Sequence, residues 1–98
     1  MPIRMKVYRQ GKETLVAAAD ADLIGKTFRE GKFKIEVGPF YEGDVVSEET
    51  LVSQLRLATI GNFVGTETVE AAMRGGFVSD AGVLWIDGVP HAQFVMIM

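Results

Sequence analysis

The only histidine of the chain, His91, lies in a block that combines turn residues, a rigid proline and polar side chains, Trp85-Ile86-Asp87-Gly88-Val89-Pro90-His91-Ala92-Gln93. An imidazole can exchange protons or accept hydrogen bonds near neutral pH. Because His91 and Gln93 are two positions apart, a strand would point both side chains to the same side. Pro90 fixes the backbone in front of them. This block predicts a binding or catalytic group or, as the alternative, a structural histidine that forms a hydrogen bond at the start of a strand.

A second candidate is Asn62, in the segment Ala58-Thr59-Ile60-Gly61-Asn62-Phe63-Val64-Gly65-Thr66. On a helical wheel it lies within about 20° of Leu51, on the side that we expect to be buried. A buried amide needs hydrogen-bond partners, so Asn62 either holds a loop or strand edge in place or meets His91. We predict that Asn62, His91 and Gln93 line one small pocket for a ligand or partner.

A third candidate is the basic stretch from residue 25 to residue 34, which interleaves two phenylalanines with Lys26, Arg29, Lys32 and Lys34. Basic side chains beside aromatic rings are typical of RNA-binding surfaces. The alternative is an ordinary strand whose lysines face solvent while Phe33 enters the core. Gly25-Lys26-Thr27 matches the end of a phosphate-binding P-loop, but Asp20 occupies the position of its first glycine.

Composition limits the classes of function. The chain has 98 residues, of which 48% are hydrophobic and 23% charged, and its formal net charge is −3. These values predict a single globular domain over residues 1–98 and argue against wholesale nucleic-acid binding, although a local basic patch remains compatible. With one histidine and no cysteine, no metal site is expected, and no cofactor motif is present. The start of the chain has the pattern of a strand and no apolar run could cross a bilayer, so we expect a soluble cytoplasmic protein.

The hydrophobic pattern predicts the elements that must position these residues. Alternation and apolar runs indicate strands at 3–9, 14–19, 32–37, 83–86 and 92–97, with a tight turn at Asp87-Gly88. Helical spacing indicates helices at 48–63 and 67–74, with Ser47 and Thr66 as N-caps and Gly65 as the stop between them. We predict an α+β two-layer sandwich, a mostly antiparallel sheet with two helices on one face. The last strand should lie inside the sheet, and Trp85 or Leu84 should be buried.

The chain resembles, over nearly its full length, the archaeal family known as domain of unknown function 424. The resemblance rests on three blocks, Leu23 to Gly31, Ala58 to Gly65 and, above all, Gly88-Val89-Pro90-His91-Ala92-Gln93. It implies an archaeal cytosolic protein with an α/β two-layer sandwich and brings no catalytic residues. The genes that tend to neighbour this family suggest a link to translation or ribosome assembly.

These observations favour a non-enzymatic binding module for a protein or RNA partner. The main alternative is a small enzyme or ligand-binding protein that uses a pocket around His91. A third possibility is homo-oligomerisation through an exposed sheet edge or the apolar C-terminal strand.

Overall fold

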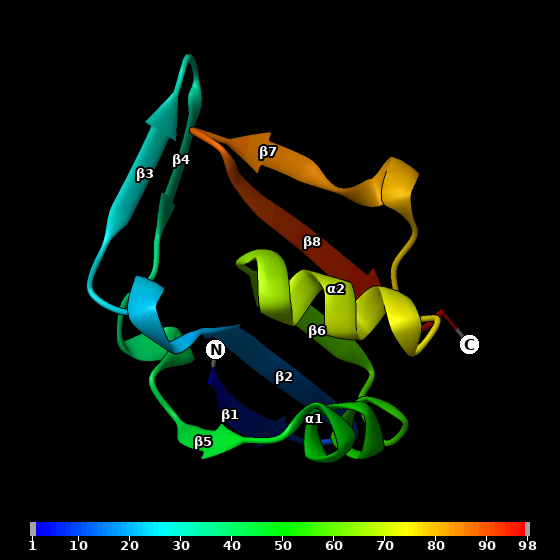
Figure 1. Cartoon of the computed structure of the whole chain (residues 1–98). Helices are drawn as coiled ribbons and strands as arrows, with labels where there is room; N and C mark the ends of the chain where they lie inside the picture. The colour runs from blue at the N-terminus through cyan, green and yellow to red at the C-terminus, as the bar shows by residue number, and fades with distance from the viewer. Residues whose placement is uncertain (1, 98) are drawn as a thin grey trace.

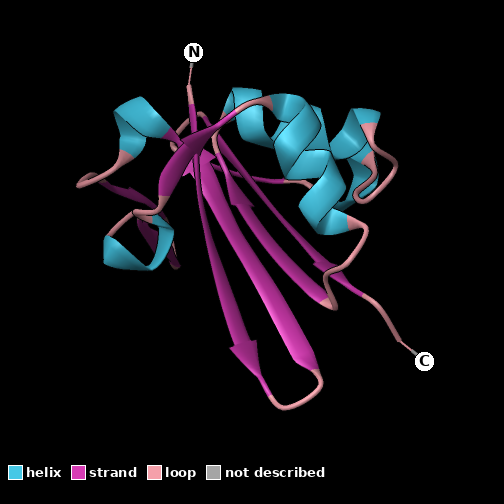
Figure 2. Cartoon of the chain, turned by 90° about the horizontal axis from the view of Figure 1, so that it is seen from below, coloured by secondary structure: helices cyan, strands magenta, loops and turns pink. Residues whose placement is uncertain are grey.

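A computed structural model of the protein describes residues 2–97, and its central feature is a six-stranded sheet with two helices on one face (Figures 1 and 2). The strands follow the order β5 (Asp44–Val46), β1 (Ile3–Gln10), β2 (Glu13–Asp20), β6 (Ile60–Val64), β8 (Val89–Val95) and β7 (Leu84–Ile86). Only the β2–β6 pair is parallel; the other neighbours in this sheet are antiparallel. The helices are α1 (Glu48–Leu55) and α2 (Thr66–Arg74). The predicted α+β sandwich is confirmed.

The remaining elements are short. Strands β3 (Thr27–Glu30) and β4 (Phe33–Glu36) form a separate hairpin, which we call the arm. Three single-turn 3-10 helices, η1 (Ala21–Leu23), η2 (Pro39–Tyr41) and η3 (Asp80–Gly82), connect the longer elements. In the described part of the chain, no helix is long and apolar enough to span a membrane.

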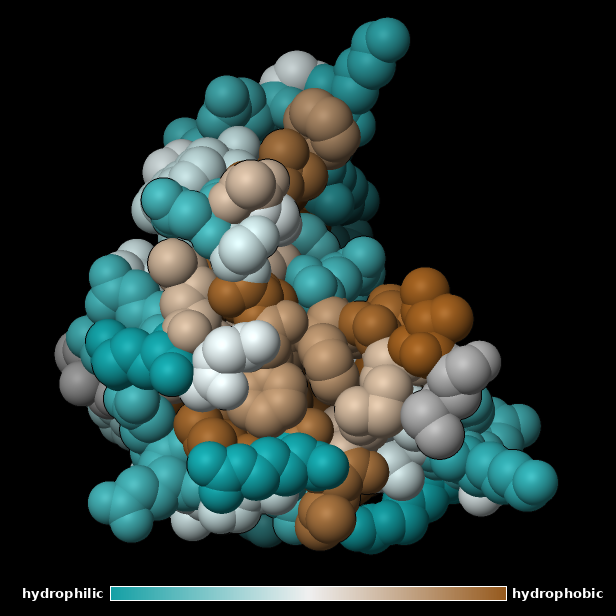
Figure 3. All heavy atoms as spheres, turned by 90° about the vertical axis from the view of Figure 1, so that its right-hand side faces the viewer, coloured by the Kyte–Doolittle hydropathy of each residue, from teal (hydrophilic) through white to brown (hydrophobic). Residues whose placement is uncertain are grey.

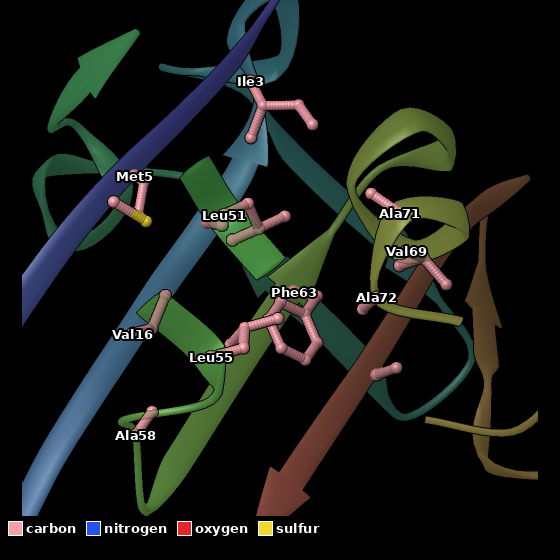
Figure 4. Packing of buried hydrophobic residues seen from close by; sticks show 12 residues of the cluster. Ile3, Met5, Val16, Leu51, Leu55, Ala58, Phe63, Val69, Ala71 and Ala72 are labelled. Carbon is pink, nitrogen blue, oxygen red and sulfur yellow. The ribbon is translucent and has the colours of Figure 1, made fainter. Parts of the chain in front are cut away.

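The main core lies between the helices and the sheet (Figure 4). Leu51 and Leu55 of α1 and Phe63 of β6 are fully buried there, and Val16 of β2 packs in the same cluster. The alternation predicted for β1 holds, because Ile3 and Met5 face this core. Burial of these apolar side chains is the main stabilising contribution to the fold.

The opposite side of the sheet, which we call the helix-free face, is only partly covered. Ala17 and Ala19 of β2 and Val64 of β6 are buried here, under Val37 and Tyr41 from the segment that follows the arm. The small alanine side chains allow this segment to pack closely on the sheet. The strand positions beyond this cover carry the polar candidates.

The helix predicted over 48–63 is wrong in its second half. Ser47 caps α1 as predicted, since its Oγ accepts from Thr50 N at 3.1 Å, but the helix ends at Leu55 and residues 60–64 form β6. A short apolar run fits either a strand or a buried helix, and this one is buried on both sides of the sheet. The missing side chain at Gly61 leaves space for the ring of Phe63, because a Cβ at position 61 would lie 2.4 Å from Cζ of Phe63.

Gly65, predicted to stop a helix, instead precedes one. Gly65, and not Thr66 as predicted, occupies the N-cap position of α2, with φ of +105°. Asp20 at the end of β2, 47 residues before Glu67, supplies the capping carboxylate. The Asp20 carboxylate accepts from Glu67 N at 3.2 Å, from Thr68 N at 2.9 Å and from Thr68 Oγ1 at 2.8 Å. A side chain at position 65 would collide with this carboxylate, so glycine is required there. This contact fixes α2 to the parallel strand pair.

The C-terminal region differs from the prediction in exposure more than in topology. Strand β8 lies between β6 and β7, as predicted, and the two-residue turn at Asp87-Gly88 has positive φ at both positions. Trp85 and Leu84, however, are 57% and 38% exposed, so neither is buried. Strand β8 ends at Val95, and the apolar residues Val95, Met96 and Ile97 are exposed; Figure 3 shows apolar side chains gathered on one side of the molecule.

Candidate functional site

The structure places Asn62, His91 and Gln93 on neighbouring strands of the helix-free face. Asn62 in β6 lies directly opposite Gln93 in β8, and His91 lies opposite Val64, two positions further along the same pair. Directly opposed side chains in an antiparallel pair have Cβ atoms about 5 Å apart. The three residues are therefore brought together, but by two strands: the expectation that Asn62 comes from a helix and faces Leu51 is wrong.

The orientation of the Asn62 amide is fixed by Tyr41. The Tyr41 hydroxyl donates to Asn62 Oδ1 at 2.6 Å. Burial raises the pKa of Tyr41 to about 12, so this hydroxyl keeps its proton at neutral pH. Because Oδ1 accepts from Tyr41, the Asn62 NH₂ group is the part of the amide left for a partner. Tyr41 thus holds a hydrogen-bond donor in place.

His91 is oriented by the main chain of the neighbouring strand. Its Nδ1 lies 2.9 Å from the carbonyl oxygen of Phe63. A carbonyl can only accept, so Nδ1 carries the proton and donates, and in the neutral ring Nε2 is then an acceptor. Within residues 2–97, Nε2 has no hydrogen-bond partner and no group of three or more His, Asp or Glu could hold a metal ion. His91 is held as a fixed, half-buried acceptor.

Two further residues of β1 extend this surface. Lys6 lies opposite Ala17, and Ala17 lies opposite Asn62. Lys6, Asn62 and Gln93 therefore occupy one row across four strands, which we call the polar row. Next to Lys6 on the same face, Tyr8 stacks on Phe40 with ring centroids 5.1 Å apart, and Lys6 Nζ lies 5.5 Å from the Tyr8 ring centroid. The pairing of β2 with β6 is the contact that brings Lys6 into one row with Asn62.

The basic set is exposed; Arg29, Lys32 and Lys34 lie on the arm, and Lys26 directly precedes it. Arg29 and Lys34 are directly opposite each other, and Lys34 Nζ also lies 2.7 Å from Glu36 Oε1. This ion pair, with a smaller contribution from Arg29, lowers the pKa of Glu36. Phe33, expected in the core, is 52% exposed, because it lies one residue beyond the hairpin tip.

The basic side chains of the arm do not lie next to the polar row. Phe28 and Ile35 alternate with Arg29 and Lys34, and these two apolar residues pack with the cluster on the helix-free face. Arg29 and Lys34 therefore point to the other side of the arm. At its tip the arm reaches the β7–β8 turn, where Glu30 Oε1 accepts from Asp87 N at 2.7 Å. The polar row and the basic arm are adjacent but separate surfaces.

The fold is shared with a protein of known structure. The chain is similar to an uncharacterized conserved protein from Methanopyrus kandleri, whose crystal structure matches with a TM-score of 0.83 at 18% identity, over 100% of this chain and 96% of that one. At this identity the likeness concerns the fold alone. No curated protein sequence matches the chain. The family model described as "Protein of unknown function (DUF424)" matches residues 8–97, and the chain therefore belongs to this family.

Proposed function

We propose that the protein is a non-enzymatic binding module that holds single-stranded RNA against its helix-free face. The observation that supports this most is the row of outward hydrogen-bonding groups on Asn62, Gln93 and Lys6, beside the aromatic pair of Tyr8 and Phe40. Unpaired bases are recognised by hydrogen bonds to their edges and by stacking on aromatic rings. Amide side chains offer both donors and acceptors for this purpose.

The distribution of charge supports a polyanionic partner despite the net charge of −3. The first 38 residues contain eight of the ten lysines and arginines, and the arm and β1 carry most of them. The two remaining basic residues are Arg56 and Arg74, and Arg74 forms an ion pair with Glu48, whose Oε1 lies 2.6 Å from Nη2. Arg29 and Lys34 lie directly opposite each other, and the single carboxylate of Glu36, which pairs with Lys34, compensates only part of their combined charge. A phosphate group near both cations would be attracted by the remaining charge.

The rival function, catalysis or small-ligand binding at His91, has less support. His91 Nδ1 faces a main-chain carbonyl, and no carboxylate among the described residues is hydrogen-bonded to the ring, so no Ser-His-Asp type of triad is formed there. The exposed position of Gln93 also suits a large partner more than an enclosed ligand. A role in translation stays a prediction of the family resemblance.

RNA binding is tested by fluorescence anisotropy with a labelled single-stranded RNA of mixed sequence, about 12 nucleotides long. Arg29→Glu should weaken binding about ten-fold and reduce its salt dependence. Arg56→Glu is the matched control, because Arg56 is also exposed but lies at the end of α1 on the helix side. Equal losses in the two variants would show only a general effect of net charge and would contradict the proposal.

The polar row needs a separate variant. Gln93 is exposed, and no side-chain hydrogen bond holds it within the described residues, so Gln93→Ala should leave the melting temperature unchanged and weaken RNA binding several-fold. Ser53→Ala, which truncates an exposed polar side chain of α1 on the helix side, is the control and should bind as wild type does. Unchanged affinity in Gln93→Ala would remove the polar row from the proposed surface.

A further inference from the structure

The outer edge of β7 has main-chain groups directed away from the sheet. The two-residue turn makes Ile86 and Val89 the hydrogen-bonded pair next to it, so Trp85 and Pro90 form a non-hydrogen-bonded pair. The contact on the other side of β8 agrees with this pattern, because the carbonyl of Pro90 points to β6 and accepts from Gly65 N at 2.9 Å. The N–H and C=O of Trp85 therefore point outward, and in residues 2–97 no strand pairs with that side of β7.

A hollow of about 100 Å³ lies beside the Trp85 side chain, between β7 and α2. Apolar side chains, among them Val83 and Met73, form part of its wall, and Glu70 and Asp80 are at its rim. Neither carboxylate has an ion-pair partner among the described residues, and none of the residues that line the hollow is Lys or Arg. The only tryptophan of the chain, 57% exposed, is thus combined with two carboxylates. Within residues 2–97, Asp80 has no cation beside it, and the one cation near Glu70, Arg74, is already paired with Glu48.

We propose that this edge binds an extended segment of a partner protein in which a lysine or arginine is flanked by apolar residues. The segment adds a strand to β7, and its basic residue lies opposite Trp85 on the helix side. There its cation lies over the indole ring and near Glu70 and Asp80, an arrangement that combines cation–π and charge attraction. The two flanking residues point to the helix-free face, where Leu84 is 38% exposed.

Charge argues against a second copy of the chain as the occupant. Antiparallel pairing of two β7 edges would bring two sets of Glu70, Asp80 and Asp87 together, and none of the residues that line either hollow is Lys or Arg. The other sheet edge, β5, begins with Asp44 and is acidic as well. Pairing β7 with β5 would be a head-to-tail contact, which builds a ring or a filament and not a twofold dimer. A basic segment of another protein satisfies the same main-chain groups and neutralises the carboxylates.

The test uses the full chain and a synthetic peptide, acetyl-Gly-Val-Arg-Val-Gly-amide, with the intrinsic fluorescence of Trp85 as the signal. We expect saturable binding with a Kd of about 1 mM or tighter. The same peptide with Glu in place of Arg should bind at least ten-fold more weakly. Equal binding of the two peptides, or no saturable signal from the arginine peptide, would overturn the proposal.

Two further measurements separate strand addition from simple attraction of a cation. In the added strand the arginine is the residue hydrogen-bonded to Trp85, so N-methylation of its amide should abolish binding, whereas N-methylation of the preceding valine should be tolerated. Glu70→Gln/Asp80→Asn should weaken binding about ten-fold, and Asp44→Asn/Glu49→Gln, with the same change of net charge at remote exposed sites, should not. Equal effects of the two methylations, equal effects of the two double variants, or a wild-type dimer that Trp85→Ser dissociates, would contradict the assignment.

Discussion

Removal of the Asp20 carboxylate should be among the most destabilising single changes in this chain. Asp20 is 7% exposed and accepts three hydrogen bonds, two of them from main-chain amides at the start of α2. In Asp20→Ala, the amide and hydroxyl of Thr68, which is fully buried, lose their acceptor, and water does not replace it. Hydrogen bonds to a charged group contribute about 1.5–3 kcal/mol each, and those sharing one carboxylate do not add fully. We expect a loss of about 3–5 kcal/mol in the free energy of unfolding.

Urea unfolding followed by far-ultraviolet circular dichroism measures this loss. In a domain of this size the same change should lower Tm by about 15–30 °C. Asp20→Asn keeps one acceptor oxygen and should lose about 1–2 kcal/mol. Asp22→Ala is the control, because Asp22 is exposed in η1 and should change the stability by less than about 0.5 kcal/mol.

A second substitution, at Gly65, tests the contact between Asp20 and the start of α2 independently. A Cβ on Gly65 would lie 2.4 Å from Asp20 Cγ, so Gly65→Ala should be strongly destabilising in the wild-type chain. In the Asp20→Ala background the collision is absent, and only the strain of φ at +105° remains. The two substitutions should therefore be less than additive, by at least about 1 kcal/mol. Full additivity, or a loss below about 1 kcal/mol in Asp20→Ala, would refute the assignment of Asp20 as the cap of α2.

Three other outcomes follow from the structure. Gly61→Ala should cost about 1–3 kcal/mol, measured by urea unfolding, because its Cβ would lie 2.4 Å from Cζ of the fully buried Phe63 ring; a neutral effect would contradict this packing. Since burial raises the pKa of Tyr41 to about 12, above its value of about 10 in the unfolded chain, its contribution to stability is complete below pH 10 and is lost as the pH rises toward 12; Tyr41→Phe should remove this part of the pH dependence, and an unchanged profile would contradict it. Ile97→Asp should change the stability by less than about 0.5 kcal/mol, because Ile97 is 90% exposed, and a large loss would show that the C-terminal end is packed.

The parts of the fold that depend on local pattern could be predicted from the sequence. Alternation in β1, the Ser47 cap and the Asp87-Gly88 turn each involve residues close together in the chain, and the structure confirms all three. The parts that depend on distant contacts could not. Gly65 was interpreted as a helix stop because its actual partner, the Asp20 carboxylate, comes from another strand.

The candidate site shows the same limit. The polar residues Asn62, His91 and Gln93 were identified by type, yet the helix assigned to Asn62 was wrong, because an apolar run with a glycine carries no clear period. The strand register that places Asn62 opposite Gln93, and the Tyr41 hydroxyl that fixes its amide, are tertiary contacts. The exposure of Trp85 was also missed, since a large apolar side chain is ordinarily expected in the core.

The proposed function is tested most directly by nuclear magnetic resonance of the ¹⁵N-labelled protein during titration with the same single-stranded RNA. We expect the side-chain NH₂ signals of Asn62 and Gln93 and the main-chain amides of β1, β6, β8 and the arm to shift together and saturate. The amides of α1 and α2 should not shift. Shifts confined to α1 and α2, or no shifts at RNA concentrations well above about 1 mM, would contradict the proposed function.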